Sequence, residues 1–337
     1  MKPKTTSSLA DFEKKLFDIK DDPMPKGAWW WWFWLFFFDN PKDPEKPRQL
    51  MILWSTKNVK TIDCNDLLIK LHHPLNRSNL DGAVAAWYFD GEKMRHDYVL
   101  EQCYMSITET GLESESNTPT SFKIEGTRNI IRIGDNMEFE AESKGTHEFT
   151  QPIYGFDKYP FGKGYSILRL NHLKLKGKVD GKKITGSAYF QRVFVNAPVP
   201  QWYWGIMHFQ KGAVLTYFNP SLYGKSLNKD ISFFDGKKMH SFDEIKVKRE
   251  GGEIPSFYVK SENEKERIEF TVKAYSHSSW TFRKKMFGLI PNKLVYNEYP
   301  STITKFRLKN KRNGGTIILD DLGSSVGNVE HTTGLLI

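Results

Sequence analysis

Two neighbouring segments of the chain carry the side chains best suited to chemistry. If residues 186–194 and 202–208 are strands, side chains two positions apart share a face. Tyr189 and Gln191 then point to one side of the first strand, and Trp202, Trp204 and His208 point to one side of the second. An apolar wall with a few converging polar groups is typical of small-molecule sites. The sequence therefore predicts a ligand pocket lined by these five residues, with Tyr189 and His208 as catalytic candidates.

A second interpretation of the same residues stays open. The tryptophans can equally be core side chains, and His208 can be a hydrogen-bonded histidine of the core or its rim. The choice depends on whether the aromatic face of each strand meets a ligand or the protein's own interior.

Aromatic walls suit polyene or isoprenoid substrates, because ring faces stabilise a developing cation by roughly 0.5–2 kcal/mol per contact. Such chemistry also needs an acid. The candidates are Glu330, which we place among the catalytic residues, and Glu298, Asp97 and Glu101. Burial would raise the pKa of a glutamic acid and keep it protonated near neutral pH. Each of these carboxyl groups can instead be solvated or ion-paired.

A tryptophan-rich segment, WWWWFWLFFF at 29–38, must hold part of the same architecture. Its apolar run is too short for a membrane-spanning helix, which needs roughly 20 residues. As a strand it would be apolar on both faces. One face would meet a core, and the other a second layer, another domain or an apolar cavity. We count Trp30 and Trp32 among the ligand-binding candidates.

Turn residues and alternating patterns predict an all-β protein. Helical patterns occur only at 8–18 and 63–71. Both halves show an aromatic strand ending at Asn-Pro, then an Asp-Gly pair, then a Ser-Phe strand. Asp-Gly favours two-residue type I′ hairpins. This order predicts two tandem β domains, 1–160 and 161–337.

The segment GSAYFQRVFVNAPVPQWYWGIMHFQKGAVLTYF, 186–218, resembles a signature of the carotenoid 1,2-hydratase and AttH-like group, which includes fungal Diels–Alderases. The closing GSSVGNVEH, 323–331, resembles the last strand of that group. The resemblance implies two consecutive antiparallel lipocalin-like domains, the first a β-sandwich or barrel and the second a barrel. It also implies a cofactor-independent hydratase, cyclase or isomerase acting on an isoprenoid-like molecule. Hydratase-like members carry a presumed proton-donating aspartate where this chain has Gln191, so a non-catalytic carrier or sensor of a lipid is the alternative.

Charge and composition limit the partners. The composition is globular, and the two cysteines are too few for a disulfide framework, so we expect a reduced, cytoplasmic protein. Residues 161–337 hold 29 Lys and Arg against 15 Asp and Glu, a net charge of +14. This excess predicts either solvated strand edges or peripheral contact with an anionic membrane surface. No standard nucleic-acid, metal or phosphate-loop motif is present, so neither nucleic acid nor a cofactor is predicted.

Overall fold

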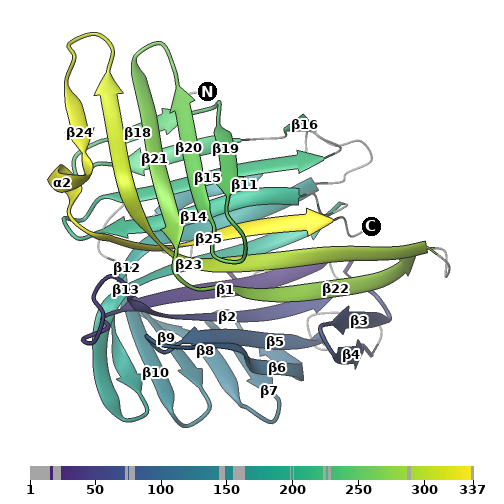
Figure 1. Ribbon diagram of the computed structural model, residues 1–337. Helices are drawn as coiled ribbons and strands as arrows, with labels where there is room; N and C mark the ends of the chain where they lie inside the picture. The colour runs from purple at the N-terminus through teal and green to yellow at the C-terminus, as the bar shows by residue number, and fades with distance from the viewer. Residues whose placement is uncertain are drawn as a thin grey trace. The chain divides into compact units, whose positions relative to one another are not determined.

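A computed structural model describes residues 16–17, 24–72, 75, 80–143, 149–154, 164–197, 199, 201–222, 225–226, 229–286 and 290–334. The chain divides into two compact units (Figure 1). The first consists of Met1–Asp39, Gln49–Tyr88 and Arg95–Pro198. The second consists of Asn40–Arg48, Phe89–Met94 and Val199–Ile337. The predicted helix at 8–18 lies mostly outside the described residues.

The first unit is a closed antiparallel barrel. Its main sheet has the order β10-β9-β8-β7-β6-β5-β2-β1-β13-β12-β11, and β10 also pairs with β12, which closes the sheet on itself. The strands are β1 (Trp29–Phe38), β2 (Arg48–Lys57), β5 (Leu80–Phe89), β6 (Met94–Ile107), β7 (Gly111–Glu115), β8 (Thr120–Glu125), β9 (Arg128–Ile133), β10 (Met137–Glu142), β11 (Phe149–Tyr154), β12 (Gly164–Val179) and β13 (Lys182–Asn196). The closed ring consists of the ten strands from β10 to β12 in this order, which leaves them no free edge, and β11 pairs with β12 beside it.

The tryptophan-rich segment is strand β1, as its turn residues and length predicted. Trp30, Trp32 and Trp34 alternate with the odd-numbered residues and lie in the barrel core. Trp30 stacks on Trp32 with ring centroids 6.2 Å apart, and its ring lies 4.3 Å from that of Phe194. The even-numbered face of β1 therefore forms the interior of the first unit.

The predicted helix at 63–71 is wrong. Residues 61–70 form a hairpin of β3 (Thr61–Cys64) and β4 (Leu67–Lys70). Asn65 has a φ of 51°, the left-handed conformation that asparagine tolerates in a tight turn. The turn at Asn65 reverses the chain, so β4 pairs with β3 and the segment does not form a helix.

The second unit is a large antiparallel sheet. Its main order is β18-β17-β15-β14-β25-β23-β21-β20-β19, with β16 beside β15 and with β22 and β24 beside β23. The elements are β14 (Gln201–Phe209), β15 (Val214–Leu222), β16 (Lys225–Ser226), β17 (Asp230–Phe234), β18 (Met239–Phe242), β19 (Lys246–Glu250), β20 (Ser256–Glu262), β21 (Glu266–Ala274), β22 (Ser278–Met286), β23 (Ile290–Asn310), β24 (Thr316–Ile318), the short helix α2 (Leu319–Leu322) and β25 (Ser325–Gly334). Its core contains Met207, Tyr217, Phe270, Tyr299 and Val329.

The division between the units differs from the predicted boundary at residue 160. Strands β12 and β13 pair with each other, and β13 pairs with β1 over ten residues, from Trp29↔Val195 to Phe38↔Gly186. Residues 164–196 therefore belong to the sheet of the first unit. The pattern of local signals could not show this, because the partner strand lies some 150 residues earlier in the chain.

Both Asp-Gly pairs form tight turns. In each turn the aspartate N–H donates to a lysine carbonyl three residues later, Asp90 to Lys93 and Asp235 to Lys238. Only the glycines, Gly91 and Gly236, have positive φ. A type I′ turn needs positive φ at both central residues, so the predicted turn type is wrong although both turns exist.

Candidate acid site in the second unit

A row of polar and aromatic side chains crosses the sheet of the second unit. Ser278, Glu298, Glu330 and Trp204 stand opposite one another on β22, β23, β25 and β14. Residues directly opposite each other in antiparallel strands point to the same side. The neighbouring positions, such as Val329, belong to the hydrophobic core on the other side of the sheet. The row therefore lies on the face opposite the core of this unit.

Two glutamates form the centre of this row. Glu298 is 0% exposed and Glu330 is 3% exposed. The indole Nε1 of Trp202 donates to Oε2 of Glu330 at 2.8 Å, and the side-chain amide of Asn328 donates to Oε2 of Glu298. The hydroxyl of Tyr296 hydrogen bonds to both carboxyl groups. Each carboxyl group thus accepts a hydrogen bond from a different side chain, and the Tyr296 hydroxyl bridges the two groups.

Burial raises the pKa of Glu298 well above its ordinary 4.5, and the nearby charge of Glu330 raises it further. Burial also raises the pKa of Tyr296 well above 10, with the negative charge of both carboxylates adding to the effect. Two carboxylates side by side in a buried site cannot both ionise cheaply. Burial and the charge of the neighbouring carboxylate both favour a proton on the pair, and the raised pKa of Glu298 favours that residue as its holder. A buried carboxylic acid of this kind can act as a general acid.

Two further polar atoms lie on this face. Ile206 of β14 stands between Thr216 of β15 and Asn328 of β25. Within the described residues, Oγ1 of Thr216 and Oδ1 of Asn328 are buried and have no hydrogen-bond partner. An unpaired buried polar group costs roughly 1–3 kcal/mol. Both atoms are therefore suited to bind a polar group of a ligand beside the acid pair.

The predicted pocket residues lie in different units. Tyr189 and Gln191 are on β13 of the first unit, where the Tyr189 hydroxyl donates to Oε1 of Gln191 at 3.0 Å. Trp202, Trp204 and His208 are on β14 of the second unit. There Trp202 donates a hydrogen bond to Glu330, and Trp204 stands directly opposite Glu330 in the pairing of β14 with β25. His208 is buried two positions beyond Ile206 on the same face.

Trp30 and Trp32 lie in the barrel core of the first unit, within the aromatic cluster described above. The Nε1 of Trp32 donates to the carbonyl of Leu16 at 2.8 Å. Of the other acids considered, Asp97 is exposed and accepts from Asn65 at 3.2 Å. Glu101 accepts from the backbone and hydroxyl of Thr118 at 2.9 and 2.8 Å, so it anchors a turn.

Tyr296, Asn328 and Thr216 were not among the residues suggested by the sequence. A usable signal existed for two of them. Tyr296 precedes Glu298 by two positions, and Asn328 precedes Glu330 by two, so in a strand each pair shares a face. Polar pairs at this spacing within otherwise apolar strands indicate a buried polar cluster. In the part of the chain that the structure describes, no group of three His, Cys, Asp or Glu residues could hold a metal ion.

Comparison with known proteins places the fold. No protein-family model and no curated protein sequence matches the chain. Its structure is similar to the crystal structure of a protein assigned as AttH from Nitrosomonas europaea, with 13% identity, a TM-score of 0.55, and coverage of 94% of this chain and 97% of the other. Kievitone hydratase from Nectria haematococca matches with 11% identity over 92% of this chain and 89% of the other, at a TM-score of only 0.38.

The match to AttH shows a shared fold. The resemblance of the sequence to the AttH-like group is therefore confirmed at this level, as is the all-β lipocalin-like architecture. The described residues contain no helix of the length and apolar character needed to span a bilayer.

Proposed function

We propose that this protein is a cofactor-independent enzyme of the hydratase type, which protonates a carbon–carbon double bond of a hydrophobic, isoprenoid-like molecule. The observation that carries the proposal is the buried pair Glu298–Glu330, bridged by Tyr296. Burial and the charge of Glu330 raise the pKa of Glu298 and so favour its protonated form. The sequence resemblance to carotenoid 1,2-hydratases points to the same class of reaction.

The two carboxyl groups suit different roles. Both acids are buried and each accepts a side-chain hydrogen bond, Glu330 from Trp202 and Glu298 from Asn328. Burial and the charge of Glu330 outweigh the Asn328 bond and raise the pKa of Glu298. Glu298 is accordingly the acid and Glu330 the base. Environments that push two pKa values apart are the usual basis of such a division.

The reaction then proceeds in balanced steps. The Glu298 carboxyl gives its proton to one alkene carbon, and the π electrons form the new C–H bond. The other carbon becomes a cation beside the rings of Trp202 and Trp204, whose faces attract positive charge. A water oxygen forms the new C–O bond, and Glu330 takes the proton that water releases. A proton passed from Glu330 to Glu298 through the Tyr296 hydroxyl restores the starting state.

Labelled water tests this reaction. The protein is incubated with an acyclic carotenoid in D2O and separately in water enriched in 18O, and the products are analysed by mass spectrometry. The product formed in D2O should carry one deuterium on carbon, and the product formed in enriched water should carry one 18O. Glu298→Gln should lower the rate by about 10²–10⁴-fold, the usual contribution of a general acid.

The matched control is Glu262→Gln, which removes an exposed carboxylate of the same unit that pairs with Lys311 at 3.2 Å. This variant should keep full activity. Equal rates for Glu298→Gln and the unmodified protein would refute the acid role.

The alternative function is a carrier of the same ligand class. One argument for a carrier is Gln191, which stands where the group's presumed proton donor would be. The other is that binding a ligand, without any reaction, would satisfy the unpaired buried atoms of Thr216 and Asn328. A carrier would co-purify with an apolar compound and release it unchanged. Mass spectrometry of material extracted from the purified protein separates the two functions, because an enzyme would yield both the alkene and its hydrated form.

A further inference from the structure

The outward face of the strands β19, β20, β21 and β23 is strongly basic. Register places Lys246, Lys260, Glu269 and Arg307 in one row across these four strands. The adjacent row consists of Lys248, Tyr258, Thr271 and Lys305. Together the two rows carry five cationic side chains and one carboxylate. We call these eight residues the basic face.

Most of its positive charge is not neutralised within the protein. In the described residues, Lys260, Lys305 and Arg307 make no ion pair with a carboxylate. The one carboxylate of the face, Glu269, already pairs with Arg267 at 2.8 Å. The basic face therefore presents a positive potential to its surroundings.

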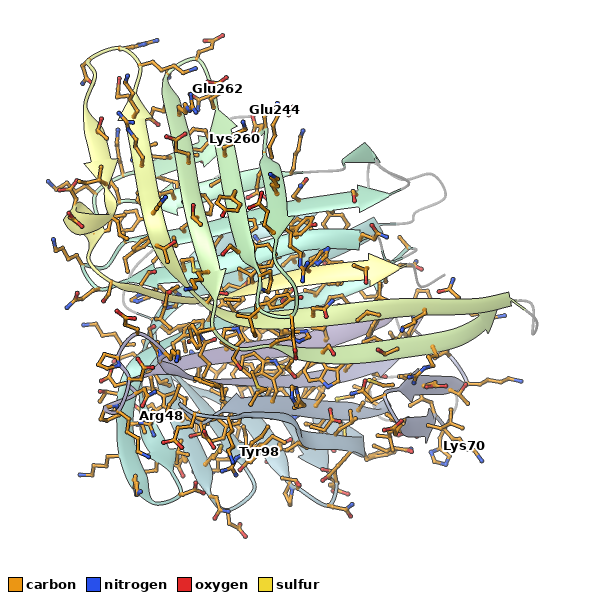
Figure 2. The ribbon with its side chains drawn as sticks, viewed as in Figure 1. Arg48, Lys70, Tyr98, Glu244, Lys260 and Glu262 are labelled. Carbon is orange, nitrogen blue, oxygen red and sulfur yellow. The ribbon has the colours of Figure 1, made fainter. Side chains whose placement is uncertain are left out.

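The acidic residues near this face are also occupied. Glu262 follows Lys260 on β20 by two positions (Figure 2). Its carboxylate pairs with Lys311 at 3.2 Å. Glu244, before β19, pairs with Lys229 at 2.5 Å, and Glu250 pairs with Lys248. An external anion would thus meet little competition from the protein's own carboxylates.

The basic face is also hollowed and partly apolar. It lines a shallow groove of about 440 Å³. Tyr258, in the middle of the second row, is 43% exposed. Ile318 of β24 stands opposite Arg307 in register and is 42% exposed. Exposed aromatic and aliphatic side chains among lysines and arginines are typical of surfaces that lie on the lipid headgroups of a membrane.

We propose that the basic face docks the protein onto an anionic membrane surface. Lys260, Lys305 and Arg307 bind lipid phosphate and carboxylate groups, while Tyr258 and Ile318 enter the headgroup layer. The partner is argued from charge complementarity and from the exposed apolar side chains, which a free anion would not use. This inference does not depend on the proposed catalytic activity.

Vesicle sedimentation with the full chain tests the proposal. We expect binding to vesicles of phosphatidylcholine mixed with phosphatidylserine, weak binding to phosphatidylcholine alone, and a decrease as salt is raised, because salt screens exposed charges. The variant Lys260→Glu/Lys305→Glu/Arg307→Glu should lower the partition coefficient by at least about 100-fold, since each basic residue near the surface contributes separately. All three positions are exposed, so thermal unfolding should show a folded variant.

A matched control carries the same change in net charge. Lys174→Glu/Lys178→Glu/Lys183→Glu replaces three exposed lysines of the first unit. This control should bind anionic vesicles nearly as well as the unmodified chain. An equal loss of vesicle binding in both triple variants would show that net charge alone governs binding. That result would overturn the assignment of the basic face.

The double variant Tyr258→Ser/Ile318→Ser keeps every charge and tests the apolar contribution. It should bind anionic vesicles more weakly than the unmodified chain. Two other ligands separate the sources of the anion. Binding of inorganic phosphate or of a DNA duplex at the basic face, without binding to anionic vesicles, would overturn the membrane proposal.

Discussion

Glu298 and Glu330 stand directly opposite each other on β23 and β25, and the Tyr296 hydroxyl hydrogen bonds to both carboxyl groups. This arrangement makes the protein's stability depend on pH. Because burial raises the pKa of Glu298 above 4.5, the folded state binds more protons than the unfolded state at pH values between 4.5 and the raised pKa. The free energy of unfolding should therefore fall as pH rises through this window.

The variant Glu298→Gln removes this titration while keeping a similar shape. We expect its unfolding free energy, measured by urea titration from pH 5 to pH 8, to fall less steeply with pH than that of the unmodified protein. Glu262→Gln serves as the exposed control and should keep the original slope. Parallel profiles for Glu298→Gln and the unmodified protein would mean that Glu298 ionises in the folded state as easily as in water.

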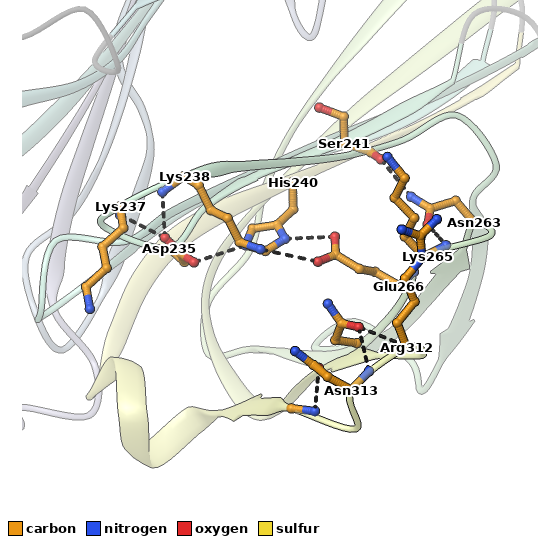
Figure 3. A network of polar contacts seen from close by, with 12 residues as sticks. Asp235, Lys237, Lys238, His240, Ser241, Asn263, Lys265, Glu266, Arg312 and Asn313 are labelled. Atoms are coloured by element: carbon orange, nitrogen blue, oxygen red, sulfur yellow. Dashed lines mark hydrogen bonds and ion pairs between the residues drawn. The ribbon is translucent and has the colours of Figure 1, made fainter.

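A second polar cluster should give the opposite dependence. His240 is buried between two carboxylates, with Nε2 3.1 Å from Asp235 and Nδ1 2.9 Å from Glu266 (Figure 3). Partial burial by itself raises the pKa of Asp235, but hydrogen bonds from the Lys238 N–H and from His240 outweigh it and lower that pKa below 3.8. Partial burial likewise opposes ionisation of Glu266, but His240 lowers its pKa below 4.5.

Lowered carboxylate pKa values stabilise the fold above the ordinary pKa values, and this stability is lost as pH falls through the lowered ones. His240→Phe should lower the unfolding free energy by about 3 kcal/mol at pH 7, the upper value for a lost hydrogen bond to a charged group. The difference should shrink as pH falls below 4. Lys237→Ala is the control, because Lys237 contacts Asp235 only through its backbone N–H. A difference that stays constant down to pH 3 would speak against the ionic cluster.

Gly205, the glycine of the Trp-Tyr-Trp-Gly segment, makes room for a ring. A Cβ atom added there would lie 2.4 Å from the ring of Tyr217, its partner across β14 and β15. Gly205→Ala should destabilise the protein by about 1–3 kcal/mol, a typical cost of overpacking a core. Gly252→Ala, where an added Cβ meets nothing within 4 Å, should change little. Urea unfolding of both variants checks this, and equal stabilities would show that Tyr217 moves aside at no cost.

The two faces of β1 should respond differently to truncation. Trp30 is 3% exposed in the barrel core, and the guanidinium of Arg192 lies 4.5 Å from its ring centroid. Trp30→Ala should cost about 3–5 kcal/mol of stability. Trp31, on the other face, is only partly buried and contacts Trp29 at a centroid distance of 5.1 Å. Trp31→Ala should cost less, as thermal unfolding can show, and a larger loss for Trp31 would reverse the assignment of the faces.

Local patterns along the sequence determined the class of fold. Alternation over two residues, turn pairs such as Asp90-Gly91 and the apolar run of β1 all act between near neighbours, so they could be recognised without a structure. The helix predicted at 63–71 is wrong because local patterns do not decide which of several allowed conformations Asn65 adopts. In the structure Asn65 is left-handed, and the segment forms a hairpin. The membership of β12 and β13 in the first unit was beyond such signals.

The candidate site shows the same limit more clearly. The sequence contains Glu298 and Glu330 as two acids among many, 32 residues apart, and alternation indicates only that each faces one side of its strand. Their pairing arises from the register of β23 with β25, which is fixed by hydrogen bonds and side-chain packing across the sheet. Burial of that face then raises the pKa of Glu298. Residue types determine which groups can transfer a proton, whereas only the tertiary structure brings two of them together away from water and sets which one holds it.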